Sequence, residues 1–161
     1  METLHRSKFV LFFSLLLLLM VSCNTQTGSS TQAGKRIEKH VGGPCQGCEA
    51  VFEYGKQVLS PVDTLPTFNS LDAKLKLSGI VFQKDGKTPA ANVILYIYHT
   101  NPAGIYETKG DEQGWGSRHG YLRGWVQTAE DGQYAFYTTR PGAYPNGQEA
   151  EHIHMIVKEE T

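Results

Sequence analysis

The second half of the chain alternates short apolar runs with polar turn segments. The runs are rich in Val, Ile, Leu, Tyr and Phe, and they occupy residues 75–82, 92–99, 121–128, 133–139 and 152–157. Short runs of β-branched and aromatic residues, separated at intervals by turn signals, are typical of strands in a two-sheet structure. We therefore expect an all-β fold, an antiparallel β-sandwich, over residues 71–161.

Turn residues and the lack of long helical patterns support this prediction. The Asp-Gly pairs at 85–86 and 131–132 suit tight turns that require a positive φ. No run after residue 70 keeps a helical period over three turns, whereas residues 48–59 allow one short helix. Loops on a rigid sheet often carry sites, so we expect the function in loop 100–120, although a solvent-facing loop without a role would have the same composition.

The N-terminus has the pattern of an export signal. Two cations, Arg6 and Lys8, precede an apolar run of about 13 residues from Phe9 to Val21. This run is shorter than the roughly 20 residues that span a bilayer, which predicts a signal peptide over residues 1–22.

The next residue, Cys23, resembles the lipidated cysteine of a bacterial lipobox. We expect lipidation of Cys23, a flexible polar tether within residues 23–40, and a membrane-anchored bacterial lipoprotein in the periplasm or on the cell surface. The alternative is ordinary cleavage near Ser22, which would leave Cys23 as a free thiol.

The segment over residues 41–70 contains a CxxC sequence with Cys45 and Cys48. In an oxidising compartment, and with Cys23 lipidated, these two cysteines are left to form a disulfide with each other. Two free thiols, or a metal or redox function, are the open alternatives. A zinc site would need two further ligands, and there is no second CxxC.

Composition limits the size of the fold and the kind of partner. The chain has 161 residues, of which 40% are apolar and 19% charged, enough for a single folded domain. Its formal net charge of −1, with scattered Lys and Arg, provides no basic stripe. We therefore expect no nucleic-acid partner.

Four side chains in the second half are of the kinds that together hold a ferric ion: Tyr106, Tyr144, His152 and His154. The two histidines are two residues apart, so a strand would put both imidazoles on the same face. Ferric iron prefers anionic oxygen, and a phenol supplies it only when the metal displaces a proton with a free pKa of about 10. Two tyrosinates therefore favour Fe(III) over zinc, which is usually bound by Cys, His or carboxylate.

The histidine pair alone allows other interpretations. A ferrous site with two His and one carboxylate, from Glu149 or Glu151, is one alternative. The remaining histidines of this half, His99 and His119, belong to no such pattern, and we expect them to be structural or exposed.

Three stretches around these residues carry a family resemblance: LSGIVFQKDGKTPAANVILYIYHTNPAGIY, YLRGWVQTAEDGQYAFYTTRPGAYP and HIH. They resemble the intradiol ring-cleavage dioxygenases, the family of protocatechuate 3,4-dioxygenase and catechol 1,2-dioxygenase. The resemblance implies a sandwich of the transthyretin/immunoglobulin-like type. It also implies a nonhaem Fe(III) bound by Tyr106 after NPAGI, by Tyr144 inside PGAYP, and by His152 and His154.

The resemblance further implies that the protein cleaves a catechol-type aromatic ring with O2 to a muconate-type diacid. Tyr144 would be the tyrosinate that leaves the metal and the base that helps to deprotonate the catechol. The family commonly has an Arg three residues before the first His of the pair, where this chain has Glu149. We expect Arg140 to supply the missing charge as a catalytic residue, with Arg118 and Arg123 as alternatives and Arg123 as the more structural of them.

The rival interpretation is a noncatalytic transthyretin-like or carboxypeptidase-regulatory-like domain that serves as a binding or spacer module on the cell surface. Such modules share the strand and turn motifs. Both interpretations predict the same sandwich. Compared with the family, the sandwich looks C-terminally short after His154, so we expect the HIH strand to form an open edge and the protein to be a candidate homo-oligomer.

Overall fold

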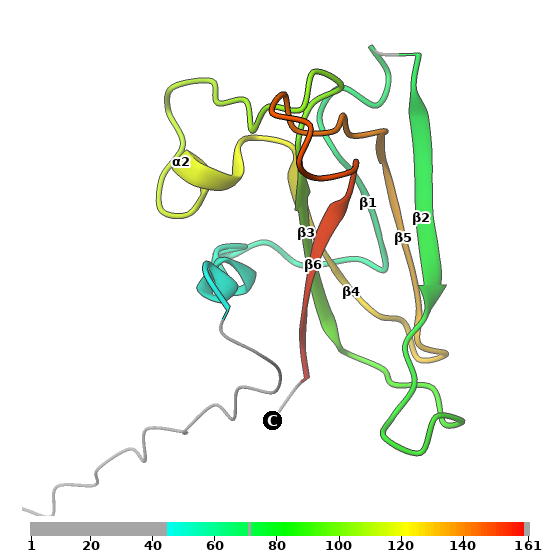
Figure 1. Ribbon diagram of the computed structural model, residues 1–161. Helices are drawn as coiled ribbons and strands as arrows, with labels where there is room; N and C mark the ends of the chain where they lie inside the picture. Colours follow the sequence, from blue (N-terminus) through cyan, green and yellow to red (C-terminus); the bar gives the residue numbers. More distant parts are fainter. Residues whose placement is uncertain (1–44, 71, 160–161) are drawn as a thin grey trace, which may run out of the picture. The chain divides into compact units, whose positions relative to one another are not determined.

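The computed structural model describes residues 45–70 and 72–159 (Figure 1). The predicted signal peptide, Cys23 and the predicted tether lie outside these residues. All described residues belong to one compact unit, Gly42–Thr161, which contains two three-stranded sheets. The all-β prediction is therefore confirmed. Within the described residues, no helix has the length and apolar character needed to cross a membrane.

The first sheet has the strand order β1-β5-β2. Its central strand β5 (Gln133–Thr139) pairs antiparallel with β2 (Lys74–Ile80) and parallel with β1 (Val62–Thr64). We did not predict β1, and it adds one parallel pair to a sandwich that we expected to be antiparallel throughout. This short strand is also tied to the second sheet, because the Asp63 carboxylate accepts a hydrogen bond from the backbone N–H of Trp125 at 3.2 Å.

The second sheet has the strand order β4-β3-β6. Its central strand β3 (Ile94–His99) pairs antiparallel with β4 (Arg123–Gln127) on one side and with β6 (Ile153–Lys158) on the other. All five strands that the apolar runs predict are thus present, with bounds within about two residues of the predicted ones.

β3 is buried on both faces, which explains its nearly continuous apolar sequence. Leu95 and Ile97 face the first sheet and pack in a core with Phe136. Tyr96 and Tyr98 belong to a second core on the opposite face. Because successive residues of a strand point to opposite faces, β3 contributes to both cores at once, and each large side chain buried in this way stabilises the fold by about 1.5–3 kcal/mol.

Short helical segments cover the outer face of the second sheet. The 3-10 helix η1 (Cys48–Phe52) and the single turn α2 (Gly116–His119) lie on the same side of this sheet, away from β2 and β5 (Figure 1). η1 occupies the first part of the short helix predicted over residues 48–59. The indole N–H of Trp125 on β4 donates to the Ala50 carbonyl oxygen at 3.1 Å, which attaches η1 to the sheet.

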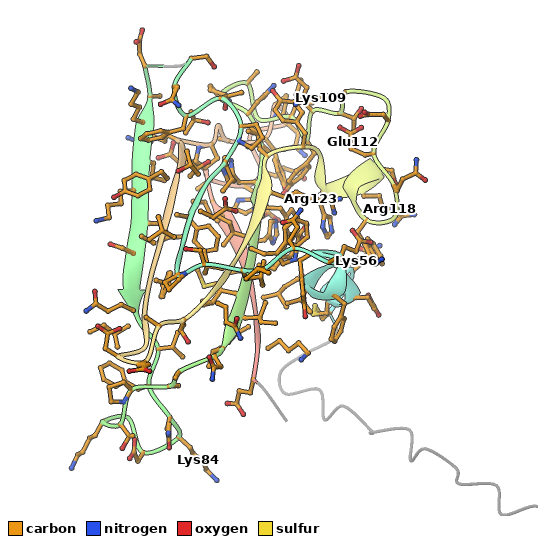
Figure 2. The ribbon with its side chains drawn as sticks, turned by 180° about the vertical axis from the view of Figure 1, so that it is seen from behind. Lys56, Lys84, Lys109, Glu112, Arg118 and Arg123 are labelled. Atoms are coloured by element: carbon orange, nitrogen blue, oxygen red, sulfur yellow. A yellow bond between two sulfur atoms is a disulfide. The ribbon has the colours of Figure 1, made fainter. Side chains whose placement is uncertain are left out.

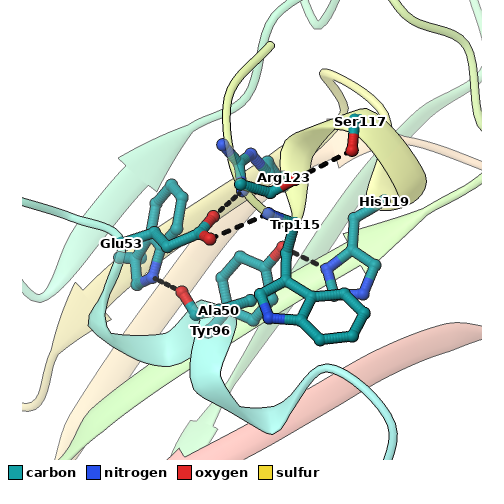
Figure 3. Close-up of polar contacts among 9 residues, drawn as sticks. Ala50, Glu53, Tyr96, Trp115, Ser117, His119 and Arg123 are labelled. Carbon is teal, nitrogen blue, oxygen red and sulfur yellow. Dashed lines mark hydrogen bonds and ion pairs between the residues drawn. The ribbon is translucent and has the colours of Figure 1, made fainter.

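Glu53 connects this helical layer to the second sheet (Figure 3). One carboxylate oxygen of Glu53 lies 2.6 Å from Nη1 of Arg123, and the other accepts from the backbone N–H of Trp115 at 2.8 Å. A disulfide joins Cys45 to Cys48, the first residue of η1, with Cα atoms 5.7 Å apart. The layer is therefore attached to the sheet by an ion pair and a hydrogen bond as well as by apolar packing, while the disulfide closes the turn at the start of η1.

Candidate metal centre

Four polar atoms from four side chains meet beside the second sheet. The Tyr106 hydroxyl lies 2.7 Å from the Tyr144 hydroxyl and 2.9 Å from Nε2 of His154. Nε2 of His152 lies 3.1 Å from Nε2 of His154 and 3.3 Å from the Tyr144 hydroxyl. The four atoms close a ring, and we call these four residues the Tyr-His cluster. The structure thus brings together all four residues that the sequence indicates as metal ligands.

β6 positions the histidine half of the cluster. His154 lies on the strand and His152 directly precedes it, so both rings share one face. Nδ1–H of His152 donates to the Ala150 carbonyl oxygen at 2.6 Å, which leaves Nε2 of the neutral ring as an acceptor. His154 is paired across the sheet with Tyr98 of β3, and the two rings stack with centroids 4.5 Å apart.

Two loops position the tyrosine half of the cluster. Tyr106 lies in the loop after β3, and Tyr144 lies in the loop after β5. The loops touch at Gly104, which has a φ of 79° and approaches Ala143 so closely that a Cβ would collide with the Ala143 carbonyl oxygen. The glycine of NPAGIY therefore allows the contact that brings the two hydroxyl groups together.

Burial changes the acid–base properties of two cluster members. Burial raises the pKa of Tyr106 far above its ordinary value, and the hydrogen bond with Tyr144 adds to the effect. Burial, together with the nearby His152, lowers the pKa of His154. At neutral pH, without a cation, the phenol of Tyr106 keeps its proton and the imidazole of His154 is uncharged. A phenolate at Tyr106 therefore requires a positive charge close by.

The donor set fits a ferric ion. The four donor atoms form a ring with sides near 3 Å, so the centre of the ring lies about 2 Å from each atom. This matches the roughly 2.0–2.2 Å that nitrogen and oxygen ligands adopt on a first-row metal such as zinc. The atoms also share few protons. With Nε2 of His152 unprotonated, at most three protons lie among the four contacts. Such converging lone pairs, two of them from phenols, suit a hard cation that displaces protons on binding.

Arg140 lies outside the hydrogen bonds of the Tyr-His cluster. Its side chain is 65% exposed, and its Nε lies 2.9 and 3.0 Å from the two carboxylate oxygens of Glu151. The pairing raises the pKa of Arg140 and lowers the pKa of Glu151. The role of Arg140 in catalysis therefore stays a prediction. The alternative cation Arg118 lies over the Trp115 ring, at 5.7 Å, on the side of the helical layer (Figure 2).

The ferrous alternative finds little support in the arrangement of the carboxylates. Glu151 is engaged by Arg140. In the described part of the chain, no three side chains drawn from His, Cys, Asp and Glu are arranged to hold a metal. The Tyr-His cluster contains two such side chains and takes its other two donors from phenols.

The sequence interpretation missed two residues that support this site. Tyr98 of β3 and His119 of α2 stack with centroids 3.7 Å apart. Nδ1 of His119 also lies 2.8 Å from the Tyr96 hydroxyl (Figure 3). The alternation in ILYIYH signals that the two tyrosines share a face. No sequence signal identifies His119 as their partner, because α2 reaches them only through the fold. His119 and His99 are 5% and 1% exposed, so both are buried, in agreement with a structural role.

Comparisons with known proteins extend over most of the described chain. Residues 59–159 match the family model described as Dioxygenase. The chain is 32% identical over 114 residues to the protocatechuate 3,4-dioxygenase beta chain of Burkholderia cepacia, covering 63% of this chain and 48% of that protein. The chain thus spans about half the length of this curated relative.

Solved structures give matches of the same kind. The dioxygenase domain of a dioxygenase carbohydrate-binding protein fusion from Streptomyces sp. SirexAA-E is 26% identical, with a TM-score of 0.49 and coverage of 74% of this chain and 64% of that one. Catechol 1,2-dioxygenase from Pseudomonas arvilla C-1 is 21% identical, with a TM-score of 0.47 and coverage of 63% and 37%. Because the family model matches more than half of the sequence, the chain belongs to the intradiol ring-cleavage dioxygenase family.

Proposed function

We propose that this protein is an Fe(III)-dependent intradiol dioxygenase that opens a catechol-type ring with O2 to give a muconate-type diacid. One observation carries the proposal: the donor atoms of Tyr106, Tyr144, His152 and His154 converge in a ring with contacts of 2.7 to 3.3 Å. Family membership supports the same chemistry. It also favours catalysis over the rival surface module, whose motifs do not require this donor set.

The proposed roles of the two tyrosines follow from their surroundings. When bound, a ferric ion would supply the positive charge that stabilises phenolates of the protein and of a catechol. Tyr144 lies on a loop with exposed neighbours. We assign the proton from the catechol hydroxyl to the Tyr144 oxygen, which makes this residue the general base. Tyr106, which packs against the second core, stays in place.

The charge of the missing family arginine is assigned to Arg140. Its guanidinium is connected through Glu151 to the segment that leads directly into His152. A cation on this side would favour an electron-rich, negatively charged form of the bound catechol. The pairing with Glu151 weakens this effect, so the contribution of Arg140 depends on whether substrate binding separates the pair.

Iron content and colour test the proposal most directly. The protein, reconstituted with a ferric salt under oxidising conditions, is expected to bind one iron and to show a broad visible absorption from tyrosinate-to-iron charge transfer. A catechol supplied with O2 is expected to give a ring-opened diacid. The matched control is Tyr137→Phe, which removes a hydroxyl from β5 outside the cluster. A colourless protein that stays free of iron would overturn the proposal and favour the noncatalytic module.

We further propose that the protein is exported and anchored through lipid on Cys23. The disulfide between Cys45 and Cys48 supports an oxidising compartment. One acyl chain binds a membrane only marginally, whereas several hold it firmly. Expression with the full N-terminus should place the parent protein in the membrane fraction and release Cys23→Ala into the soluble fraction. Equal membrane recovery of both proteins would contradict lipidation.

A further inference from the structure

Four aromatic rings form a column that leads from the helical layer to the Tyr-His cluster. Trp115 stacks on His119 at 5.4 Å, His119 on Tyr98 at 3.7 Å, and Tyr98 on His154 at 4.5 Å between ring centroids. The two contacts of Tyr98 are almost parallel, with interplanar angles of 6° and 7°. Tyr98 is therefore clamped between two imidazoles, and one of them belongs to the cluster.

The rings of this column come from three elements, α2 with the residue before it, β3 and β6. Tyr98 and His154 are register partners on β3 and β6, so their side chains leave the sheet side by side. His119 comes from α2 and is fixed through Nδ1 by the hydroxyl of Tyr96, which is fully buried. On the outer side, Gly47 of the disulfide loop approaches so closely that a Cβ would lie 2.7 Å from Nε2 of His119. The column thus has firm support at its far end.

The two histidines of the cluster are oriented in different ways. His152 donates from Nδ1 to a backbone carbonyl oxygen, which fixes its ring plane. In the described residues, the side chain of His154 makes hydrogen bonds only through Nε2. The terminal torsion of a histidine side chain is broad, so a ring without a second hydrogen bond needs another restraint. The face of Tyr98 provides that restraint.

We infer that Tyr98, supported from behind by His119, is a positioning residue that fixes the ring plane of His154 and thereby aims its Nε2 into the cluster. This inference rests on the proposed function only where it concerns the ferric ion, since the orientation of the ring exists in the metal-free protein. Supporting groups around metal ligands commonly change metal affinity by about 10- to 100-fold when they are removed. The Tyr98 ring takes the place of the hydrogen bond that His152 has.

The first measurement uses the metal-free protein. Ring protons of His154, assigned by NMR with a His154→Gln variant, should be shifted upfield by the stacked Tyr98 ring. Tyr98→Phe keeps the ring and should keep the shift, whereas Tyr98→Leu should abolish it. His119→Leu removes the supporting ring and should reduce the shift, which gives a second route if Tyr98→Leu does not fold. The control Tyr54→Leu removes a ring from the same core outside the column and should leave the signal unchanged.

The second measurement uses the ferric protein. Tyr98→Leu is expected to bind Fe(III) about tenfold more weakly than the parent and to shift the visible band, while Tyr98→Phe and Tyr54→Leu behave like the parent. If no variant and no parent protein binds iron, the proposed function fails, and the NMR result still decides the inference. An unshifted His154 signal in the parent, or equal behaviour of Tyr98→Leu and Tyr98→Phe in both measurements, would overturn it.

Discussion

The hydroxyl groups of Tyr106 and Tyr144 touch at 2.7 Å, yet the two residues have different surroundings. Tyr106 packs against the second core and contacts His154, and burial raises its pKa. Tyr144 contacts His152 at 3.3 Å from a loop with exposed neighbours. Removal of one hydroxyl should therefore not have the same effect as removal of the other.

Tyr144→Phe is expected to keep most of the bound iron and to lower catechol turnover by about 10² or more, the usual contribution of a general base. Tyr106→Phe is expected to lose iron and to change the visible spectrum even without substrate. Iron content, absorption and ring cleavage are measured on both variants. Identical effects on iron content and on turnover would contradict the assigned roles.

His119 gives a prediction for the pH dependence of stability. Burial, with a smaller effect from Arg123, lowers the pKa of His119 to about 4 from an ordinary value of 6.5. Between these two values the unfolded chain binds the proton and the folded chain does not, so the free energy of unfolding falls as the pH falls through this window. Above pH 6.5 both states are neutral at His119 and it contributes no slope.

Urea unfolding of the iron-free protein at several pH values between 4 and 7 tests this prediction. His119 should account for up to about 1.4 kcal/mol of lost stability per pH unit inside the window. His119→Gln keeps a hydrogen-bonding group near Tyr96 but does not titrate, so its slope should be smaller than that of the parent. Equal slopes in both proteins would show that His119 is not held neutral.

At the scale of elements, local sequence patterns predicted the strands whose formation depends on their own sequence. The five longer strands follow from alternation and Asp-Gly turns, and their bounds agree with the structure. β1 has only three residues and exists through pairing with a distant strand, and α2 is a single turn, so neither has a period to detect. Local patterns gave no sign that α2 lies against Tyr98. The meeting of the two tyrosine loops was predicted only through the family resemblance, because no local rule links segments so far apart in the sequence.

The contact between those loops can be tested at Gly104. Gly104→Ala requires an unfavourable positive φ and also a collision with the Ala143 carbonyl oxygen. Gly86→Ala is a matched control, because Gly86 also has a positive φ of 67° but has open space where an added Cβ would lie. We expect Gly104→Ala to lose about 1–3 kcal/mol more stability than Gly86→Ala and to weaken iron binding. Equal unfolding energies and equal iron contents would contradict this role of Gly104.

At the scale of the whole molecule, β3 contributes side chains to both cores. β6 is an edge strand of the second sheet, paired within the described chain only with β3. Met155 and Val157 of β6 are 37% and 52% exposed. An edge strand with exposed apolar side chains can pair with another chain. Among the described residues β6 is an edge strand, and we predict that copies of the protein associate there.

Val157→Lys tests this expectation, because a charge on an exposed edge opposes strand pairing at little cost to the fold. Light scattering over a range of protein concentrations should show less association for Val157→Lys than for the parent. The control Val58→Lys removes an apolar side chain that is 98% exposed but lies in no strand. If both variants reduce association equally, general surface hydrophobicity and not the β6 edge is responsible.

The position of β6 also bears on how the proposed ligands would release a metal. An edge strand opens locally at a lower free energy than a central strand, and amide hydrogen exchange should therefore be faster in β6 than in β3. His154 lies on β6 and His152 directly precedes it, so one fraying event withdraws both imidazoles, while the loops that carry Tyr106 and Tyr144 remain joined at Gly104. Uptake and loss of the proposed iron should then follow the fraying rate of this one strand, because the contact at Gly104 keeps the two phenol-bearing loops together while β6 frays.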